Sequence, residues 1–385
     1  MHSVLLNYTL SRKDDSQDGA LSEGALLRHP LMDLLQAVDQ QGSISAAARQ
    51  LSLSYRHVWG ELKRWENELG HELIVWEKGQ SARLTEFGNK LMWAERQTQA
   101  RLAPQISALR ADLERTFAVA FDPEAHVLTL YASHDDALPR LREHAAGQGL
   151  HLDIRFCGSV DAIRALNEGR CTLAGFHTQG QPAPNSHAAM AYRGLLKPGL
   201  HKIIGFATRQ QGLVVAAGNP LKLHSLADAA RTRARFVQRS PGTGTRVLLE
   251  DLLATEQLGM QDLNNWPDEE PSHSALVEAI ASGRCDVGLG IESTARARGL
   301  SFVPLVQEQF HLVCLKSALD SPATQALRDL LKNQEWHQVL NTLAGYQSDQ
   351  CGEVQSLNAQ LPWWTFKGAK TAGVTKKTSQ KQTVA

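Results

Sequence analysis

Four short segments place hydroxyl groups, histidines or arginines where a helix is expected to begin. They are residues 131–136, 157–159, 239–246 and 272–274. The first backbone N–H groups of a helix have no partner inside it, and they attract negative charge. The chemistry that this pattern favours is the binding of an anion.

The segment RSPGTGTR, residues 239–246, is the most informative of the four. Its glycines permit close approach of the backbone, its hydroxyl groups donate hydrogen bonds, and an arginine stands at each end. It lacks the spacing of a phosphate-binding P-loop. The alternative is ordinary helix capping. The predicted ligand-binding residues are Ser133, His134, Ser159, Arg209, Arg239, Ser240, Thr243, Gly244, Thr245, Arg246 and His273.

Alternating strands and helices must position these residues. Apolar strands are expected at 127–132, 152–156, 173–176, 235–238 and 286–290, and helices at 137–146, 160–168, 245–256, 275–282 and 321–332. Buried strands alternating with helices favour a parallel α/β sheet. We expect a domain over 126–345 with two lobes, 126–206 plus 301–345 and 207–300, and a ligand cleft between them.

A second pattern, residues 42–70, predicts two short helices joined by a tight turn. Ser43 or Ser45 caps the first helix and Ser54 the second, whose apolar residues recur every three or four positions. Polar side chains are left for the outer surface, so residues 54–64 are expected to be a recognition helix. Any two packed amphipathic helices give the same pattern, which is the alternative.

Residues 73–84 predict a β-hairpin, or wing, after these helices. The predicted DNA-contacting residues are Ser43, Ser45, Ser54, Tyr55, Arg56, His57, Lys63, Arg64, Lys78 and Arg83. Glu61, Glu66 and Glu68 must then face away from the DNA. The whole chain has 40 basic and 40 acidic residues, so binding to phosphates depends on this local set.

The segments GSISAAARQLSLS and ELGHELIVWEKGQSARLTEFG resemble the winged helix-turn-helix of LysR-type and ModE-type transcriptional regulators over residues 26–115. SYRHVW resembles ModE more than LysR, where Gln-Pro or Gln-Ser usually opens the recognition helix. The resemblance implies a DNA-binding domain at 26–84 and a linker helix at 85–118. The partner that it implies is double-stranded DNA.

Residues 127–343 resemble the type II periplasmic-binding-protein (PBP) fold, most closely at 208–213, 218–220 and 236–249. These segments are similar to PBP-like domains found with ModE-like or molybdopterin-biosynthesis modules. The resemblance implies molybdate, tungstate or a molybdenum-cofactor-related ligand, although the small β-barrels of ModE are missing. Arginines at 209, 239 and 246 suit a carboxylate or phosphate equally well.

The helix expected at 86–117 has an apolar stripe of Leu91, Ala94, Thr98, Leu102, Ile106, Leu109 and Leu113. So long a helix has no partner inside a small domain, so we expect it to pack on a second chain as a homodimer or higher homo-oligomer. Pro104 interrupts the pattern and is expected to kink the helix.

Length and composition predict a cytoplasmic globular protein with two or three cores. The 385 residues are 42% hydrophobic and 21% charged, and they contain no apolar run long enough for a membrane and no recognisable signal peptide. Five scattered cysteines favour neither disulfides nor zinc. Residues 1–25 and a basic tail at 366–385 are expected to be disordered.

No catalytic residues, metal or cofactor are predicted. The group His134, Asp135 and Asp136 lies at a turn, and the common hydrolase and kinase motifs are missing. Two alternatives to the regulator remain. One is a cytoplasmic anion or cofactor carrier that uses the helix-turn-helix for interactions, and the other is a LysR-like regulator that senses a small organic acid. The role of Trp363 and Trp364, either packing on the effector domain or a subunit contact, stays open.

Overall fold

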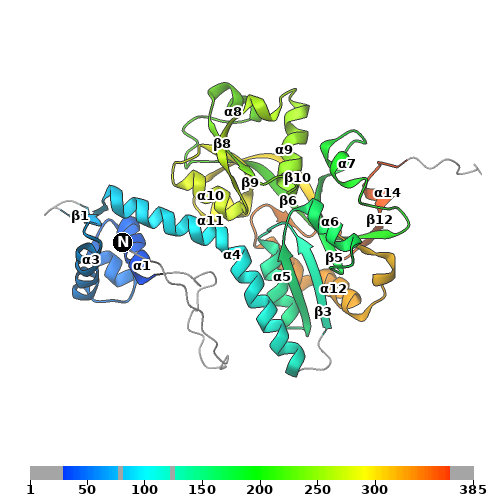
Figure 1. Ribbon diagram of the computed structural model, residues 1–385, viewed down its shortest axis with the longest axis horizontal. Coiled ribbons are helices and arrows are strands. Elements are labelled where there is room, and N and C mark those ends of the chain that lie inside the picture. The colour runs from blue at the N-terminus through cyan, green and yellow to red at the C-terminus, as the bar shows by residue number, and fades with distance from the viewer. Residues whose placement is uncertain (1–28, 77–80, 122–125, 365–385) are drawn as a thin grey trace, which may run out of the picture.

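A computed structural model describes residues 29–76, 81–121 and 126–364. It shows a small helical domain joined by one long helix to a two-lobed α/β domain (Figure 1). Lys78 and the segments expected to be disordered, 1–25 and 366–385, lie outside the described residues. No helix in the described ranges is both long and apolar enough to cross a membrane.

The N-terminal domain has the predicted order of helices and wing strands. Its elements are α1 (Pro30–Gln41), α2 (Ile44–Gln50), α3 (Tyr55–Leu69), β1 (Ile74–Val75) and β2 (Arg83–Leu84). The two strands pair antiparallel, with Ile74 opposite Leu84. Leu35, Val38 and Leu62 are fully buried between the three helices. The three- and four-residue spacing of the apolar residues in α3 therefore predicted its part of this core correctly.

Helix α4 (Glu86–Phe121) runs from the wing to the α/β domain without a break at Pro104. It lies along that domain, against β4 in one lobe and α10 in the other (Figure 1). The partners of α4 within the chain thus lie in the α/β domain, which the expectation of a partner in a second chain did not consider. The predicted stripe is still largely uncovered, since Leu109 is 60% and Leu113 38% exposed. Dimerisation through this stripe stays a prediction.

The α/β domain is built on one sheet of ten strands in the order β4-β3-β5-β10-β6-β9-β7-β8, with β11 and β12 also paired to β6. The strands are β3 (His126–Ala132), β4 (Leu150–Phe156), β5 (Leu173–Gln179), β6 (His201–Val215), β7 (Arg235–Arg239), β8 (Asn264–Glu270), β9 (Val287–Ile291), β10 (Ser301–Leu315), β11 (Tyr346–Gln347) and β12 (Val354–Ser356).

Helices cover this sheet. They are α5 (Ala137–Ala146), α6 (Ser159–Asn167), α7 (His187–Tyr192), α8 (Leu226–Thr232), α9 (Gly244–Thr255), α10 (His273–Ala281), α11 (Glu292–Ala297), α12 (Pro322–Lys332), α13 (Gln334–Asn341) and α14 (Leu357–Gln360). Five of the helices, α5, α6, α9, α10 and α12, lie close to their predicted positions. Their apolar faces lie in separate cores, two with the strands of the first lobe and two with those of the second.

The strands β6 and β10 join the two lobes, because each is 15 residues long and belongs to both. They pair antiparallel with each other over their whole length. The expectation of a parallel sheet was therefore only partly right. Parallel pairs occur within each lobe, between β3 and β4 and between β7 and β9. Strand β6 also runs through the lobe boundary that we expected at 206/207, whereas β10 begins at the boundary expected at 300/301.

The C-terminal part of the chain belongs to the first lobe beyond residue 345, where we expected the domain to end. Strands β11 and β12 pair with β6. Trp363 is buried in the core of that lobe, and its Nε1 donates to the Pro182 carbonyl at 2.9 Å. Trp363 therefore packs on its own domain.

Candidate functional site

The first turn of α3 presents polar side chains to solvent. Ser54 caps the helix, since its hydroxyl accepts from the His57 N–H at 3.1 Å. Tyr55, Arg56 and His57 are exposed, whereas Val58 on the inner face is fully buried. The outward face therefore has the geometry of a helix that can enter a DNA groove.

Three aromatic rings extend this surface toward the wing. Tyr55 stacks on Trp59 with centroids 6.4 Å apart, and Trp59 meets Trp76 edge to face at 6.0 Å. Trp76 is half exposed. We had not predicted that the two tryptophans would join the surface, although their spacing from Tyr55 and from the wing was readable in the sequence.

Acidic residues of α3 pair with basic residues of the same helix, which reduces its positively charged surface. Glu66 points inward, as expected, and accepts from the Leu73 N–H at 2.9 Å, and it also binds Lys63 at 2.6 Å. Glu61 and Glu68, which we expected to face away, instead flank Arg64 at 2.9 and 3.7 Å. The positive charge is therefore concentrated at the start of the helix.

The remaining predicted DNA-contacting residues lie around this surface. Ser43 caps α2, its hydroxyl accepting from the Ala46 N–H at 3.4 Å, whereas Ser45 is exposed. Arg83 is exposed on the second wing strand. Arg49 is exposed near the end of α2. Ser43 therefore has a structural role that does not require DNA.

The two lobes meet where α6 and α9 begin. The Val160 N–H of the first lobe donates to the Gly242 carbonyl of the second at 3.3 Å. A Cβ on Gly244 would lie 2.9 Å from His177 Nδ1 and 3.2 Å from Ser159 Oγ, so only glycine fits here. The Ser133 and Ser159 hydroxyl groups are 3.1 Å apart. The sequence-predicted Ser133, Ser159 and Gly244 are thus brought together.

Two buried histidines belong to this junction. His177 has no hydrogen-bond partner on either ring nitrogen, and His273 has none on Nδ1. His273 Nε2 lies 3.4 Å from the Thr245 hydroxyl. Burial, with nearby Arg209 and Arg239, holds the pKa of both histidines well below the usual range. Neutral imidazoles with free nitrogens can hydrogen-bond a ligand. We did not predict His177 as a polar ligand contact; it directly follows the strand expected at 173–176 and belongs to β5.

Arg209 lies in a different position from the one expected of a ligand clamp. Its guanidinium is 1% exposed and forms ion pairs with Asp135 and Glu308. Burial raises the pKa of both carboxyl groups. Tyr346 also donates to Asp135, at 2.8 Å. Since two protein carboxyl groups occupy Arg209, its role in this arrangement is to neutralise them.

Arg239 is a buried cation with an unsatisfied donor. Its Nε and Nη2 donate to the main-chain carbonyls of Glu270 and Pro271 at 3.0 and 2.9 Å, and Nη1 has no partner. Burial and the charge of Arg209 lower its pKa to about 9. Arg246 lies apart, bound to Gln238 and to Glu250. Arg239 is therefore the predicted arginine best placed to receive an anion.

A hollow of about 580 Å³ opens beside this junction, between α4 and both lobes. Of the predicted residues, it is lined by His134, Arg239, Ser240 and Thr243. Burial lowers the pKa of His134 to about 4. Thr243 caps α9, its hydroxyl accepting from the Arg246 N–H at 3.3 Å. The volume is typical of sites for small organic molecules.

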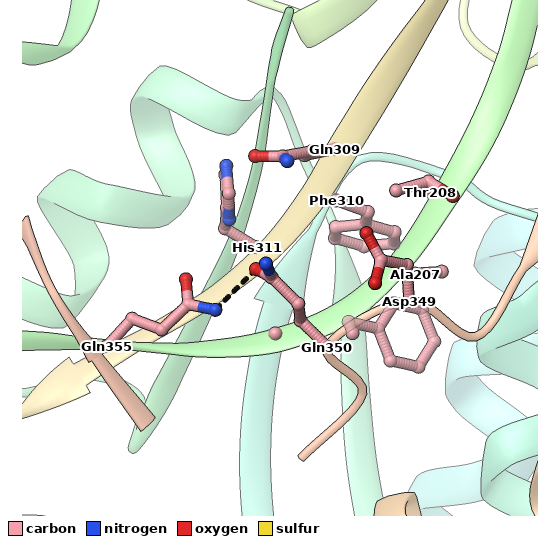
Figure 2. Close-up of a pocket in the computed structure, with 10 residues that line it drawn as sticks. Ala207, Thr208, Gln309, Phe310, His311, Asp349, Gln350 and Gln355 are labelled. Atoms are coloured by element: carbon pink, nitrogen blue, oxygen red, sulfur yellow. Dashed lines mark hydrogen bonds between the residues drawn. The ribbon is translucent and has the colours of Figure 1, made fainter. Parts of the chain in front are cut away.

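A separate hollow lies where the C-terminal segment covers β6 and β10 (Figure 2). Gln309 and His311 border it on one side and Gln350 on the other, and Gln350 accepts a hydrogen bond from Gln355 (Figure 2). Its volume of about 10 Å³ is enough for one water molecule. It is therefore too small to be the effector site.

Comparison with known families separates the chain into the same two domains. Residues 30–89 match the family described as "Bacterial regulatory helix-turn-helix protein, lysR family". Residues 141–332 match the "PBP superfamily domain". The chain therefore has a lysR-family helix-turn-helix domain followed by a PBP-like domain. The resemblance to the LysR and PBP families is confirmed, whereas a ModE-type or molybdate specificity stays a hypothesis.

Individual relatives of this chain are distant. The "Uncharacterized protein YvgK" of Bacillus subtilis (strain 168) is 25% identical over 258 residues, 67% of this chain and 82% of that protein. Full-length BenM is 16% identical with a TM-score of 0.41, covering 81% of this chain and 96% of its own. Full-length LysG from Corynebacterium glutamicum with bound effector Arg is 19% identical with a TM-score of 0.37, covering 79% and 96%.

Proposed function

We propose that this protein is a DNA-binding transcriptional regulator that reads duplex DNA with the first turns of α3. The observation that carries the proposal is the exposed row Tyr55, Arg56 and His57 on a capped helix within a lysR-family domain. Side chains at the start of a recognition helix reach base edges in the major groove. Because its proposed partner is DNA, we place the protein in the cytoplasm.

The PBP-like domain is proposed to sense an anion at the junction of the lobes. Three helices of at least nine residues, α6, α9 and α10, begin there. Unpartnered nitrogens of His177, His273 and Arg239 supply further donors. A compact dianion such as molybdate or tungstate suits neutral donors and helix ends with one buried cation.

A larger ligand is the second candidate. The hollow of about 580 Å³ continues from Arg239 to α4, and a tetrahedral oxyanion would leave most of it empty. A molybdenum-cofactor-related ligand or a small organic acid would place its anionic group near Arg239 and its body in the hollow. The lining residue Phe156, 5.1 Å from the ring of His134, offers that body an aromatic wall.

A thermal-shift screen of the full chain tests the ligand proposal. Molybdate, tungstate, sulfate, phosphate and small carboxylates are compared at equal ionic strength. An anion at a hundredfold excess over its dissociation constant is expected to stabilise the protein by about 2.7 kcal/mol. No shift with any of these anions would count against anion sensing. A gel shift with the duplex upstream of the protein's own gene separates the regulator from a carrier, which would not retard that DNA.

Dimerisation through α4 also belongs to this proposal. Leu109 and Leu113 are four residues apart on one side of the helix, and both are exposed. Two copies joined there would present two recognition helices to a two-fold symmetric operator. Leu109 also lines the hollow beside α4, so this part of the helix borders both the proposed dimer contact and the ligand hollow.

A further inference from the structure

Glu270, at the end of β8, is hydrogen-bonded to helix α4. Its carboxylate is fully buried and accepts from Arg101 Nε and Nη2, both at 2.9 Å, and from Gln97 Nε2 at 3.3 Å. A bidentate pair of this kind is strong and directional. The second lobe is therefore attached to α4 at a defined point.

Neighbouring contacts use the same side of α4. The Ser272 hydroxyl donates to the Ala100 carbonyl at 3.1 Å, and Arg284 lies 4.7 Å from the centre of the Trp93 ring. Residues 93, 97, 100 and 101 share one helical face because of their spacing. Farther along α4, Asp112 lies 3.9 Å from Arg155 of the first lobe. One helix is thus held by both lobes.

The other side of the 270–272 turn faces the proposed anion site. The Glu270 and Pro271 carbonyls accept from Arg239, whose Nη1 is unpartnered. Ser272 caps α10, at whose start His273 reaches the junction. The turn 270–272 therefore contacts both Arg239, which would meet an anion, and the residues of α4 that it holds.

We propose that the turn 270–272 couples the interlobe site to α4 and so to the position of the DNA-binding domain. An anion bound to Arg239 competes with the two carbonyls for the guanidinium. The turn then shifts, and the two hydrogen bonds from Arg101 to the Glu270 carboxylate change. A ligand acts in this way only through different affinities for the two arrangements. The inference rests on the proposed anion site at the starts of α6, α9 and α10. Glu270 acts as a positioning residue, and Arg101, which also lines the hollow, acts on that site through Glu270.

Hydrogen exchange of the full-length chain, followed by mass spectrometry, tests the coupling. Wild type and Arg101→Gln are compared with no added anion and with sodium molybdate, sodium phosphate or sodium succinate. Arg140→Gln is the matched control, since it removes the same charge from an exposed i,i+3 pair with Glu143 on α5. Arg101→Lys, which keeps the charge, is expected to restore part of the response.

In wild type, an anion that protects the starts of α6, α9 and α10 is expected to change the hydrogen-exchange rate of residues 93–105 by at least about fivefold. This factor is the lower end of typical allosteric coupling between two sites. In Arg101→Gln the protection of the three helix starts remains and the α4 response disappears. If α4 exchange in wild type does not change, or changes equally in Arg101→Gln, the coupling is overturned while the anion site stands.

A ligand-free comparison keeps the two proposals distinct. If none of the three anions protects the helix starts, the proposed anion sensing fails, and the coupling is judged by the variant alone. Arg101→Gln should then accelerate exchange both over 93–105 and in the turn and helix start at 270–276, because coupling between two sites is reciprocal. Faster exchange confined to α4 would refute the coupling.

Discussion

Arg239 and Glu270 are joined through the main chain rather than through their charges. Arg239 Nε donates to the Glu270 carbonyl at 3.0 Å, while the Glu270 carboxylate is bound to Arg101. This leaves a buried guanidinium bound to two carbonyls at the lobe junction and directs the acid toward α4. The arrangement provides one cation for an anion and one fixed attachment for the linker helix.

Ser159 is predicted to contribute to anion binding and not to DNA binding. Its buried hydroxyl faces Ser133 at the start of α6. Ser159→Ala should weaken anion binding about tenfold, as expected for one lost hydrogen bond of roughly 1.4 kcal/mol. Ser225→Ala, at the start of α8, is the matched control and should leave affinity unchanged. Isothermal titration with the stabilising anion measures this, and equal loss of DNA binding would contradict the separation of roles.

Arg209 is predicted to be essential for stability. Arg209→Met leaves Asp135 and Glu308 buried without their cation, which should cost about 3 to 5 kcal/mol. Thermal unfolding of the variant measures the loss, and the exposed Arg231→Met serves as control. Adding Asp135→Asn and Glu308→Gln to Arg209→Met should recover much of the stability. A loss below about 1 kcal/mol would show that the three groups do not act as an ion-pair network.

Acid is predicted to destabilise the first lobe through His311. Burial lowers the pKa of its imidazole from 6.5 to about 4, so the unfolded chain binds more protons once the pH falls through 6.5. Stability is therefore complete above that pH and is lost between 6.5 and about 4, by about 3 kcal/mol. His311→Gln should flatten this part of the melting-temperature profile, whereas the exposed His224→Gln should not. Identical profiles for wild type and His311→Gln would argue against a buried neutral imidazole.

The exposed stripe of α4 is predicted to form the dimer contact. Leu109→Glu combined with Leu113→Glu should convert the dimer to a monomer in light scattering, because charges would replace its apolar contacts. Lys90→Glu on the same helix is the control, since Lys90 is 71% exposed and paired with Glu86. A dimer that survives the double substitution would place the interface elsewhere.

The local elements were predictable because their signals are local. Helix α5 has the predicted bounds 137–146, and Ser54 caps α3 as its sequence position suggested. The wing strands and both lobes follow from apolar periodicity in the same way. Cap residues and side-chain spacing act within a few positions, so one sequence is sufficient to recognise them.

Long-range partners were not predictable. Arg209 was predicted to bind the ligand. Its partners Asp135 and Glu308 are 74 and 99 residues away in the sequence, and nothing near them in the sequence indicates that they pair with it. Strand β6 was missed because its polar residues 208–211 interrupt the apolar pattern. Glu270 reads as one acid among several, and only the fold brings it to Arg101, 169 residues away.

The measurement that tests the central claim most directly is fluorescence anisotropy of a labelled duplex from upstream of the protein's own gene. Wild type, Arg56→Ala and the control Arg231→Ala are titrated at several salt concentrations. Arg56→Ala should weaken binding by about 1 to 3 kcal/mol if Arg56 reads a base, or lower the salt slope by about one if it contacts a phosphate. Arg231→Ala should match wild type. Arg56→Ala binding as tightly as wild type with an unchanged salt slope, or wild type failing to bind the duplex, would contradict DNA recognition by α3.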